Sequence, residues 1–135
     1  ISPSSALIHR RLFDVYGVFD ESLPACEDYD LWLRITAHEE TAFVERPSIV
    51  KNGGHADQLS RAHWGMDRFR IYAIEKVLKT GALSHAQEVA ALRMLLKKLR
   101  ILVGGARKRD NQAVVSTYEP KLNSWSARWE ALCVG

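Results

Sequence analysis

The chain contains 135 residues, of which 47% are hydrophobic and 26% are charged, as in globular proteins and unlike disordered or collagen-like chains. This is about the length of one domain, and no apolar run approaches the roughly 20 residues that a transmembrane helix needs. Two cysteines, Cys26 and Cys133, are too few for a disulfide framework. We therefore expect a folded, reduced protein in an intracellular setting.

Charge is distributed unevenly along the chain. Residues 1–59 contain 5 Lys and Arg against 10 Asp and Glu, a net charge of −5, and residues 60–135 contain 14 against 6, a net charge of +8; together these give the overall +3. Such asymmetry predicts two regions with different roles. We divide the chain accordingly into an acidic region, 1–59, and a basic region, 60–135, whose surface suits anionic partners.

The acidic region is predicted to combine short extended segments with helices. From the apolar periodicity and the positions of Gly and Pro, we expect a short strand or extended segment over 4–9, a helix over 10–16, a helix over 27–38, a strand over 41–45, an extended piece over 48–51 and a turn over 52–54.

The basic region is predicted to be helical throughout. A first helix is expected over 61–79, and a second begins after Ser84, where Gln87 completes a capping box, and stops at Gly104 and Gly105. A last helix, over 110–132, is interrupted or started by Pro120. We expect these helices to pack as a small bundle against the acidic region.

Three carboxylates stand at the start of the helix over 27–38, on Glu27, Asp28 and Asp30. Acids are common in a first helical turn because they complement the helix dipole, by about 0.3–1 kcal/mol each. Asp30 is also spaced to form an ion pair with Arg34. A purely structural role therefore remains open at this point, beside a catalytic one.

The order of motifs favours the catalytic role. Residues 17–23 read Gly-Val-Phe-Asp-Glu-Ser-Leu, residues 27–35 read Glu-Asp-Tyr-Asp-Leu-Trp-Leu-Arg-Ile, and residues 55–60 read His-Ala-Asp-Gln-Leu-Ser. With the preceding segment 5–13, they resemble, in order and spacing, the second half of inverting family 2 glycosyltransferases with the GT-A fold. The resemblance covers roughly residues 4–60, and no motif of this family is recognised in residues 61–135.

The resemblance implies the fold and function of a sugar transferase. The fold would be an α/β fragment, mainly helical, consisting of the acceptor-side part of a GT-A nucleotide-diphospho-sugar transferase and a C-terminal three-helix region. The enzyme would transfer a sugar from a nucleotide-sugar donor to an acceptor hydroxyl with inversion, in polysaccharide or glycolipid synthesis. The alternative function is a non-catalytic helical module for protein interaction or membrane-surface contact.

The resemblance also assigns roles to individual residues. Asp28 corresponds to the general base, which must approach the acceptor hydroxyl to about 2.6–3.2 Å, and Glu27 supports it. Trp32 either packs in the core or stacks on a sugar. His55 is the candidate contact for the divalent cation, where its imidazole would suit Mn²⁺ better than Mg²⁺, and Asp57 and Gln58 line the same rim.

This family holds Mn²⁺ or Mg²⁺ against the diphosphate with an Asp-x-Asp element at the end of a strand, and no such strand-end element is found in the sequence. Asp28-Tyr29-Asp30 has the same spacing but belongs to the helix of the general base. The chain also opens on an apolar stretch without an initiator Met. We therefore expect a C-terminal fragment, inactive alone and with no cofactor bound.

Clustered cations suggest a further partner for the basic region. Lys97, Lys98 and Arg100 interleave with leucines, and residues 107–109 are all basic. They are either a solvated face or a contact with anionic lipid, and without a nucleic-acid motif we rank nucleic-acid binding last. The expected partners are a nucleotide-sugar, a saccharide or lipid-linked acceptor and the membrane surface, with no nucleic acid. The expected location is the cytoplasm, peripheral to the inner face of the membrane.

Overall fold

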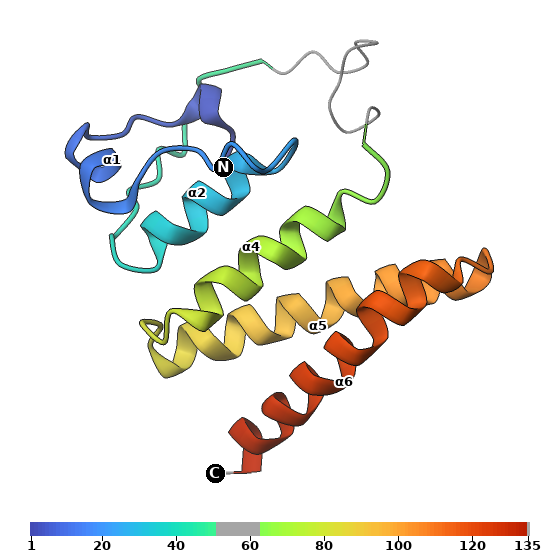
Figure 1. Cartoon of the computed structure of the whole chain (residues 1–135). Helices are drawn as coiled ribbons and strands as arrows, with labels where there is room; N and C mark the ends of the chain where they lie inside the picture. The colour runs from blue at the N-terminus through green and yellow to red at the C-terminus, as the bar shows by residue number, and fades with distance from the viewer. Residues whose placement is uncertain (51–62, 135) are drawn as a thin grey trace.

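The computed structural model describes residues 1–50 and 63–134. Along the chain, these residues form a short 3₁₀ helix, η1, and five α-helices (Figure 1). Their bounds are η1 Pro3–Ser5, α1 Arg11–Tyr16, α2 Glu27–Thr36, α4 Asp67–Lys79, α5 His85–Lys108 and α6 Gln112–Val134. None of the described helices is long and apolar enough to cross a bilayer.

The helices pack in a series in which α5 lies between α4 and α6, α4 also contacts α2, and α2 contacts α1. Leucines at helical spacing on α5, among them Leu92, Leu95 and Leu99, are fully buried at the centre of this arrangement. Ile71 and Ile74 of α4 and Val115 of α6 belong to the same core. The apolar stripe therefore packs the three long helices together, as its periodicity predicts.

The start of α5 is the capping box that the sequence predicts. The hydroxyl of Ser84 accepts a hydrogen bond from the backbone N–H of Gln87, and the side-chain oxygen of Gln87 accepts one from the backbone N–H of Ser84 at 2.8 Å. The amide nitrogen of Gln87 also donates to the carbonyl of Ala37, at 3.0 Å. The same residue thus caps α5 and joins it to the end of α2.

Two predicted helix boundaries are wrong. The helix α5 continues through Gly104 and Gly105 to Lys108. Each glycine costs about 1 kcal/mol relative to alanine in a helix, but burial of Val103 and Ala106 on both sides outweighs that cost. Similarly, α6 neither starts nor stops at Pro120, which lies inside it.

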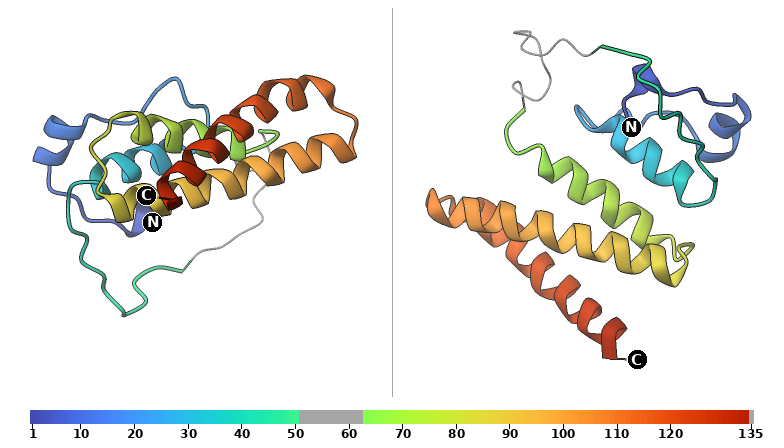
Figure 2. Two further views of the ribbon diagram at one scale, coloured as in Figure 1. Left: turned by 90° about the horizontal axis from the view of Figure 1, so that it is seen from below. Right: turned by 180° about the vertical axis from the view of Figure 1, so that it is seen from behind.

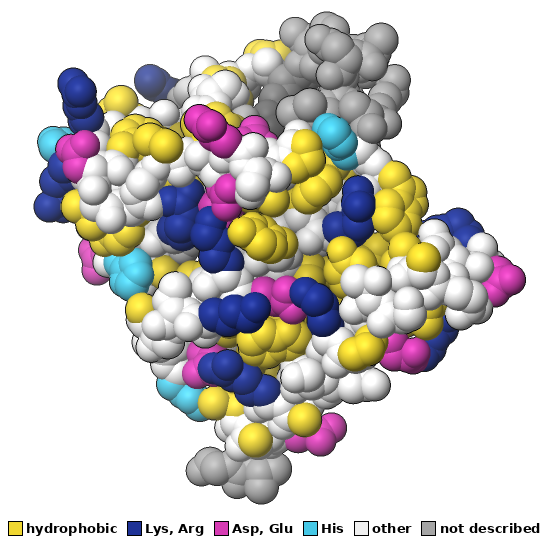
Figure 3. Space-filling view, in the orientation of Figure 1, with side chains coloured by type: hydrophobic (Ala, Val, Ile, Leu, Met, Phe, Trp, Pro, Cys, Tyr) yellow, Lys and Arg dark blue, Asp and Glu magenta, His cyan; other side chains and the backbone are white. Residues whose placement is uncertain are grey.

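The strand predicted over 41–45 is also wrong, because the described residues contain no β-strand. For the same reason, the strand alternative for residues 4–9 is not realised. Residues 3–5 form η1, and residues 41–50 have no regular secondary structure. Apolar side chains of the segments 4–9 and 41–50 are exposed, including Leu7, Phe43, Val44 and Val50. Residues with a high strand propensity form a strand only when a second strand pairs with their backbone and packs against their side chains. The space-filling view likewise shows hydrophobic side chains at the surface among Lys and Arg (Figure 3).

Candidate active site

The candidate site is built on the first turn of α2. The residue before the helix, Cys26, is buried and has φ 64°, a left-handed conformation that is uncommon for a residue with a side chain. Its carbonyl accepts the first helical hydrogen bond, from the N–H of Asp30, at 3.1 Å. The helix begins directly after this turn, and its first turn contains three acids. Their negative charges lie close to the positive end of the helix dipole.

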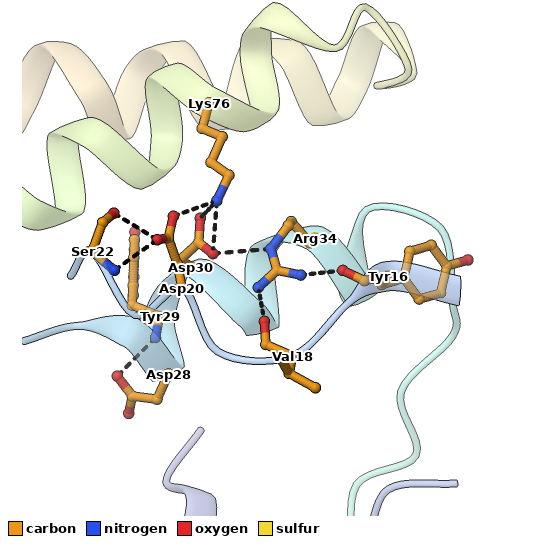
Figure 4. Close-up of polar contacts among 9 residues, drawn as sticks. All are labelled: Tyr16, Val18, Asp20, Ser22, Asp28, Tyr29, Asp30, Arg34 and Lys76. Atoms are coloured by element: carbon orange, nitrogen blue, oxygen red, sulfur yellow. Dashed lines mark hydrogen bonds and ion pairs between the residues drawn. The ribbon is translucent and has the colours of Figure 1, made fainter. Parts of the chain in front are cut away.

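Asp30 lies inside the protein, where it is only 1% exposed. One of its oxygens accepts a hydrogen bond from Nε of Arg34 at 2.9 Å, and Nζ of Lys76 lies 3.2 Å from both oxygens. Lys76 also donates to Asp20, at 2.8 Å (Figure 4). Asp30 therefore has the structural role that its spacing from Arg34 predicts, and Lys76 of α4 is its second partner.

The loop over 17–24 is held by the same charged groups. Arg34 donates hydrogen bonds to the carbonyls of Tyr16 and Val18, the latter at 2.7 Å. Asp20 accepts hydrogen bonds from Lys76 and from the hydroxyl and backbone N–H of Ser22. The hydrogen bond from Lys76, and then that from Ser22, lowers the pKa of Asp20 to about 2. The loop is thus fixed to both α2 and α4.

Asp28 has a different environment. It is half-buried, and one of its oxygens accepts the backbone N–H of Tyr29 at 2.7 Å. Its side chain lines a cavity of about 230 Å³, together with Tyr29, Trp32 and Arg70. Among the described residues its second oxygen has no hydrogen-bond donor, so it remains available to a ligand.

Two of the predicted site residues, Asp28 and Trp32, line this cavity, whereas Glu27 is half-buried and does not. Trp32 is neither fully buried nor exposed, and its indole nitrogen has no hydrogen-bond partner in the described part of the chain. The predicted residues His55, Asp57 and Gln58 lie outside the described residues.

Arg70 is a cavity residue that the sequence analysis missed. It comes from α4 and donates a 2.9 Å hydrogen bond to Asp67, which also accepts one from Lys98 at 3.0 Å. Burial raises the pKa of Asp67, but the hydrogen bonds from Arg70 and Lys98 outweigh it and the net shift is downward. Two cations therefore share one anion beside the cavity. The Asp67–Arg70 spacing was a visible signal of an ion pair, but not of its position near Asp28.

Burial raises the pKa of two further cavity groups, the thiol of Cys26 and the phenol of Tyr29, while the charge of Arg70 opposes this rise. Both groups therefore stay protonated at neutral pH. Asp28 and Arg70 are the charged side chains of the cavity wall, an anion on α2 and a cation on α4, and Ile1, which carries the α-amino group of the chain, also lines the cavity.

Comparison with known proteins gives one relationship. Over 57 residues the chain is 37% identical to an uncharacterized glycosyltransferase of Rickettsia felis. This similarity supports a relationship to a glycosyltransferase. The match covers 42% of this chain and 9% of that protein, so the chain spans a small part of its relative's length. No family model matches the chain, and no solved structure matches it significantly.

Proposed function

We propose that the chain is the acceptor-side part of an inverting glycosyltransferase with the GT-A fold and that Asp28 is its general base. One observation carries this proposal: the two aspartates of the same helical turn have opposite environments. Asp30 is buried among cations, while Asp28 faces a cavity with one oxygen available. A carboxylate that serves only to stabilise a helix needs no such cavity.

The proposed chemistry uses Asp28 to activate the acceptor. The carboxylate takes the proton of the acceptor hydroxyl while that oxygen attacks the anomeric carbon of the nucleotide-sugar. The bond from the anomeric carbon to the diphosphate breaks on the opposite side, so the configuration inverts. A nucleoside diphosphate leaves, and the new glycosidic bond carries the acceptor oxygen.

The other cavity residues suit a saccharide acceptor. Trp32 and Tyr29 offer aromatic surface, and Arg70 offers hydrogen-bond donors to hydroxyl or anionic oxygens. The volume of about 230 Å³ is less than the roughly 300–1,000 Å³ of pockets that enclose whole ligands. The cavity therefore takes one part of the acceptor, with the donor on its open side.

We further propose that the nucleotide-binding half is supplied by a longer polypeptide. Phe43 and Val44 are neighbours, and both are exposed, at 86% and 69%. Successive side chains of a strand point to opposite faces of the sheet. Consecutive apolar residues are therefore typical of a strand whose sheet is covered on both faces. This segment therefore has the pattern of an inner strand of a parallel sheet. That pattern supports the GT-A proposal.

The divalent cation belongs to the same larger site. When bound, Mn²⁺ or Mg²⁺ would neutralise the charge of the leaving diphosphate. His55 remains our proposed contact for it, with Asp57 and Gln58 at the rim. Without the nucleotide-binding half, we propose that the 135-residue chain has no transferase activity.

The proposal is tested on the protein encoded by the complete gene. Release of nucleoside diphosphate from UDP-glucose, UDP-N-acetylglucosamine and GDP-mannose is measured with Mn²⁺ or Mg²⁺, for the complete protein and for residues 1–135. We expect release by the complete protein with at least one donor and none by the chain alone. Equal turnover by the chain alone would refute the division of the site, and no turnover with any nucleotide-sugar would refute the function.

A further inference from the structure

The outward face of α5 has a concentration of positive charge that the proposed function does not use. Residues 89–109 contain seven Lys and Arg and no Asp or Glu. The leucines of this segment are buried against α4 and α6, and the basic residues lie on the other sides of the helix. We propose that this face binds an anionic lipid surface.

Only some of these cations are neutralised within the protein. Lys98 pairs with Asp67, and Arg107 pairs with Glu119. By contrast, Lys97, Arg100 and Lys108 are exposed and have no ion-pair partner in the described parts of the chain. Their charge is therefore available to an external anion.

Two of these unpaired cations, Lys97 and Lys108, alternate with exposed apolar side chains on one side of the helix. At 100° per residue, Met94, Lys97, Ile101 and Lys108 fall within an arc of roughly 60°, opposite the buried leucines. Met94 is 41% exposed and Ile101 is 56% exposed. We call these four residues the α5 face. Over its 14 residue steps, the face spans about 21 Å of helix.

Continuation of α5 through Gly104 and Gly105 makes this face possible. If the helix had stopped there, Lys108 would not be in register with Lys97 and Ile101. A Cβ atom placed on Gly104 would meet no atom within 4 Å, so the space beside this glycine is open. Seen from behind, α5 crosses in front of α6 (Figure 2, right).

The chemistry of the face favours a lipid surface over a nucleic acid. Lysines beside apolar side chains on one helical face are typical of helices that lie in the membrane interface, where the apolar groups enter the boundary of the acyl chains. Each cation near an anionic leaflet adds attraction. Nucleic-acid sites instead use stacking aromatic groups or polar contacts to bases, and the α5 face has no aromatic residue.

Co-sedimentation of the 135-residue chain with vesicles tests the proposal. The vesicles are either pure phosphatidylcholine or phosphatidylcholine with 30% phosphatidylglycerol. We expect binding to the anionic vesicles, little binding to the neutral ones, and release at high salt. The double variant Lys97→Glu and Lys108→Glu should lose at least about tenfold in affinity. Ile101→Ser, which leaves the charge unchanged, should weaken binding by a smaller factor.

A variant with the same net charge controls for non-specific attraction. Arg10→Glu with Arg46→Glu reverses two exposed cations on the acidic region, and it should bind anionic vesicles within about twofold of the unchanged chain. Far-UV circular dichroism verifies that each variant is helical. Equal losses in the two double variants would overturn the proposal, because charge alone would then explain binding. Equal binding to neutral vesicles, or tighter binding to a 20-base-pair DNA duplex, would also overturn it.

Discussion

At the scale of single residues, Lys76 joins the acidic region to the basic region. Its ammonium group lies between Asp20 of the loop and the buried Asp30 of α2. Because Arg34 also binds Asp30 and the loop carbonyls, removal of Lys76 would leave Arg34 as the sole cation partner of Asp30 among the described residues. Loss of one ion-pair partner of a buried carboxylate strongly destabilises the folded state.

We therefore expect Lys76→Met to lower the free energy of unfolding by about 2 kcal/mol at pH 7, and Lys76→Arg to lower it less.

The pKa of Asp20 is about 2 in the folded chain and near the ordinary value of about 3.9 in the unfolded chain. This carboxylate contributes stability above the unfolded pKa and loses it as the pH falls toward 2. In urea titrations, the difference between Lys76→Met and the unchanged chain should shrink from pH 5 to pH 2; a constant difference would contradict the role of Asp20.

At the scale of elements, α5 shows how packing can override local preference. Gly104 and Gly105 are poor helix formers, yet they lie in a helix because Leu102, Val103 and Ala106 are buried around them. The two glycines differ in their surroundings. A Cβ on Gly104 would meet open space, whereas one on Gly105 would lie 3.0 Å from a guanidinium nitrogen of Arg109.

We expect Gly104→Ala to raise the free energy of unfolding by about 0.5–1 kcal/mol, because alanine reduces the entropy of the unfolded chain without a clash. Gly105→Ala should gain less, since Arg109 must move. Thermal unfolding of the two variants provides a matched comparison. Destabilisation by Gly104→Ala would show that the helix does not pass through this position as described.

The N-terminal cap of the same helix makes a separate prediction. The hydroxyl of Ser84 and the side chain of Gln87 satisfy each other's backbone N–H groups. Ser84→Ala should therefore cost about 1 kcal/mol of stability. Gln87→Ala should cost more, because its bond to the carbonyl of Ala37 is also lost. Chemical denaturation checks both values, and a smaller effect of Gln87→Ala would contradict the link between α5 and α2.

The sequence predicts elements whose signals are local. The leucine spacing and the Ser84–Gln87 cap place α5, and the i, i+4 spacing predicts the Asp30–Arg34 pair. Contacts between distant segments have no such signal: Lys76 meets Asp30 across 46 positions, and Arg70 reaches the Asp28 cavity from another helix. The strand over 41–45 was mispredicted because its propensity needs partner strands.

At the scale of the whole molecule, the helices form a packed core, while the apolar side chains of residues 41–50 are exposed to solvent. Phe43, Val44 and Val50 are among the most exposed hydrophobic residues of the described chain. Such an arrangement suits one part of a larger domain, in which other strands would cover the segment. The related Rickettsia felis protein is much longer than the matched stretch, which is 9% of it.

This account predicts that Phe43→Ser has different effects in two contexts. In the 135-residue chain, the substitution should change the free energy of unfolding by less than about 0.5 kcal/mol, because the side chain is exposed. In the complete protein, where we propose that it is buried, the cost should be about 3–5 kcal/mol. Equal effects in both proteins would show that no further segment covers residue 43.

Turnover by Asp28→Asn in the complete protein tests the central claim most directly. Initial rates of sugar transfer are compared with those of Asp14→Asn, a matched change of an exposed acid on α1. We predict that Asp28→Asn lowers kcat by at least about 10²-fold with a shift in melting temperature of no more than a few degrees. Asp14→Asn should keep full turnover. Retention of more than half of the activity by a folded Asp28→Asn protein would contradict the assignment of the general base.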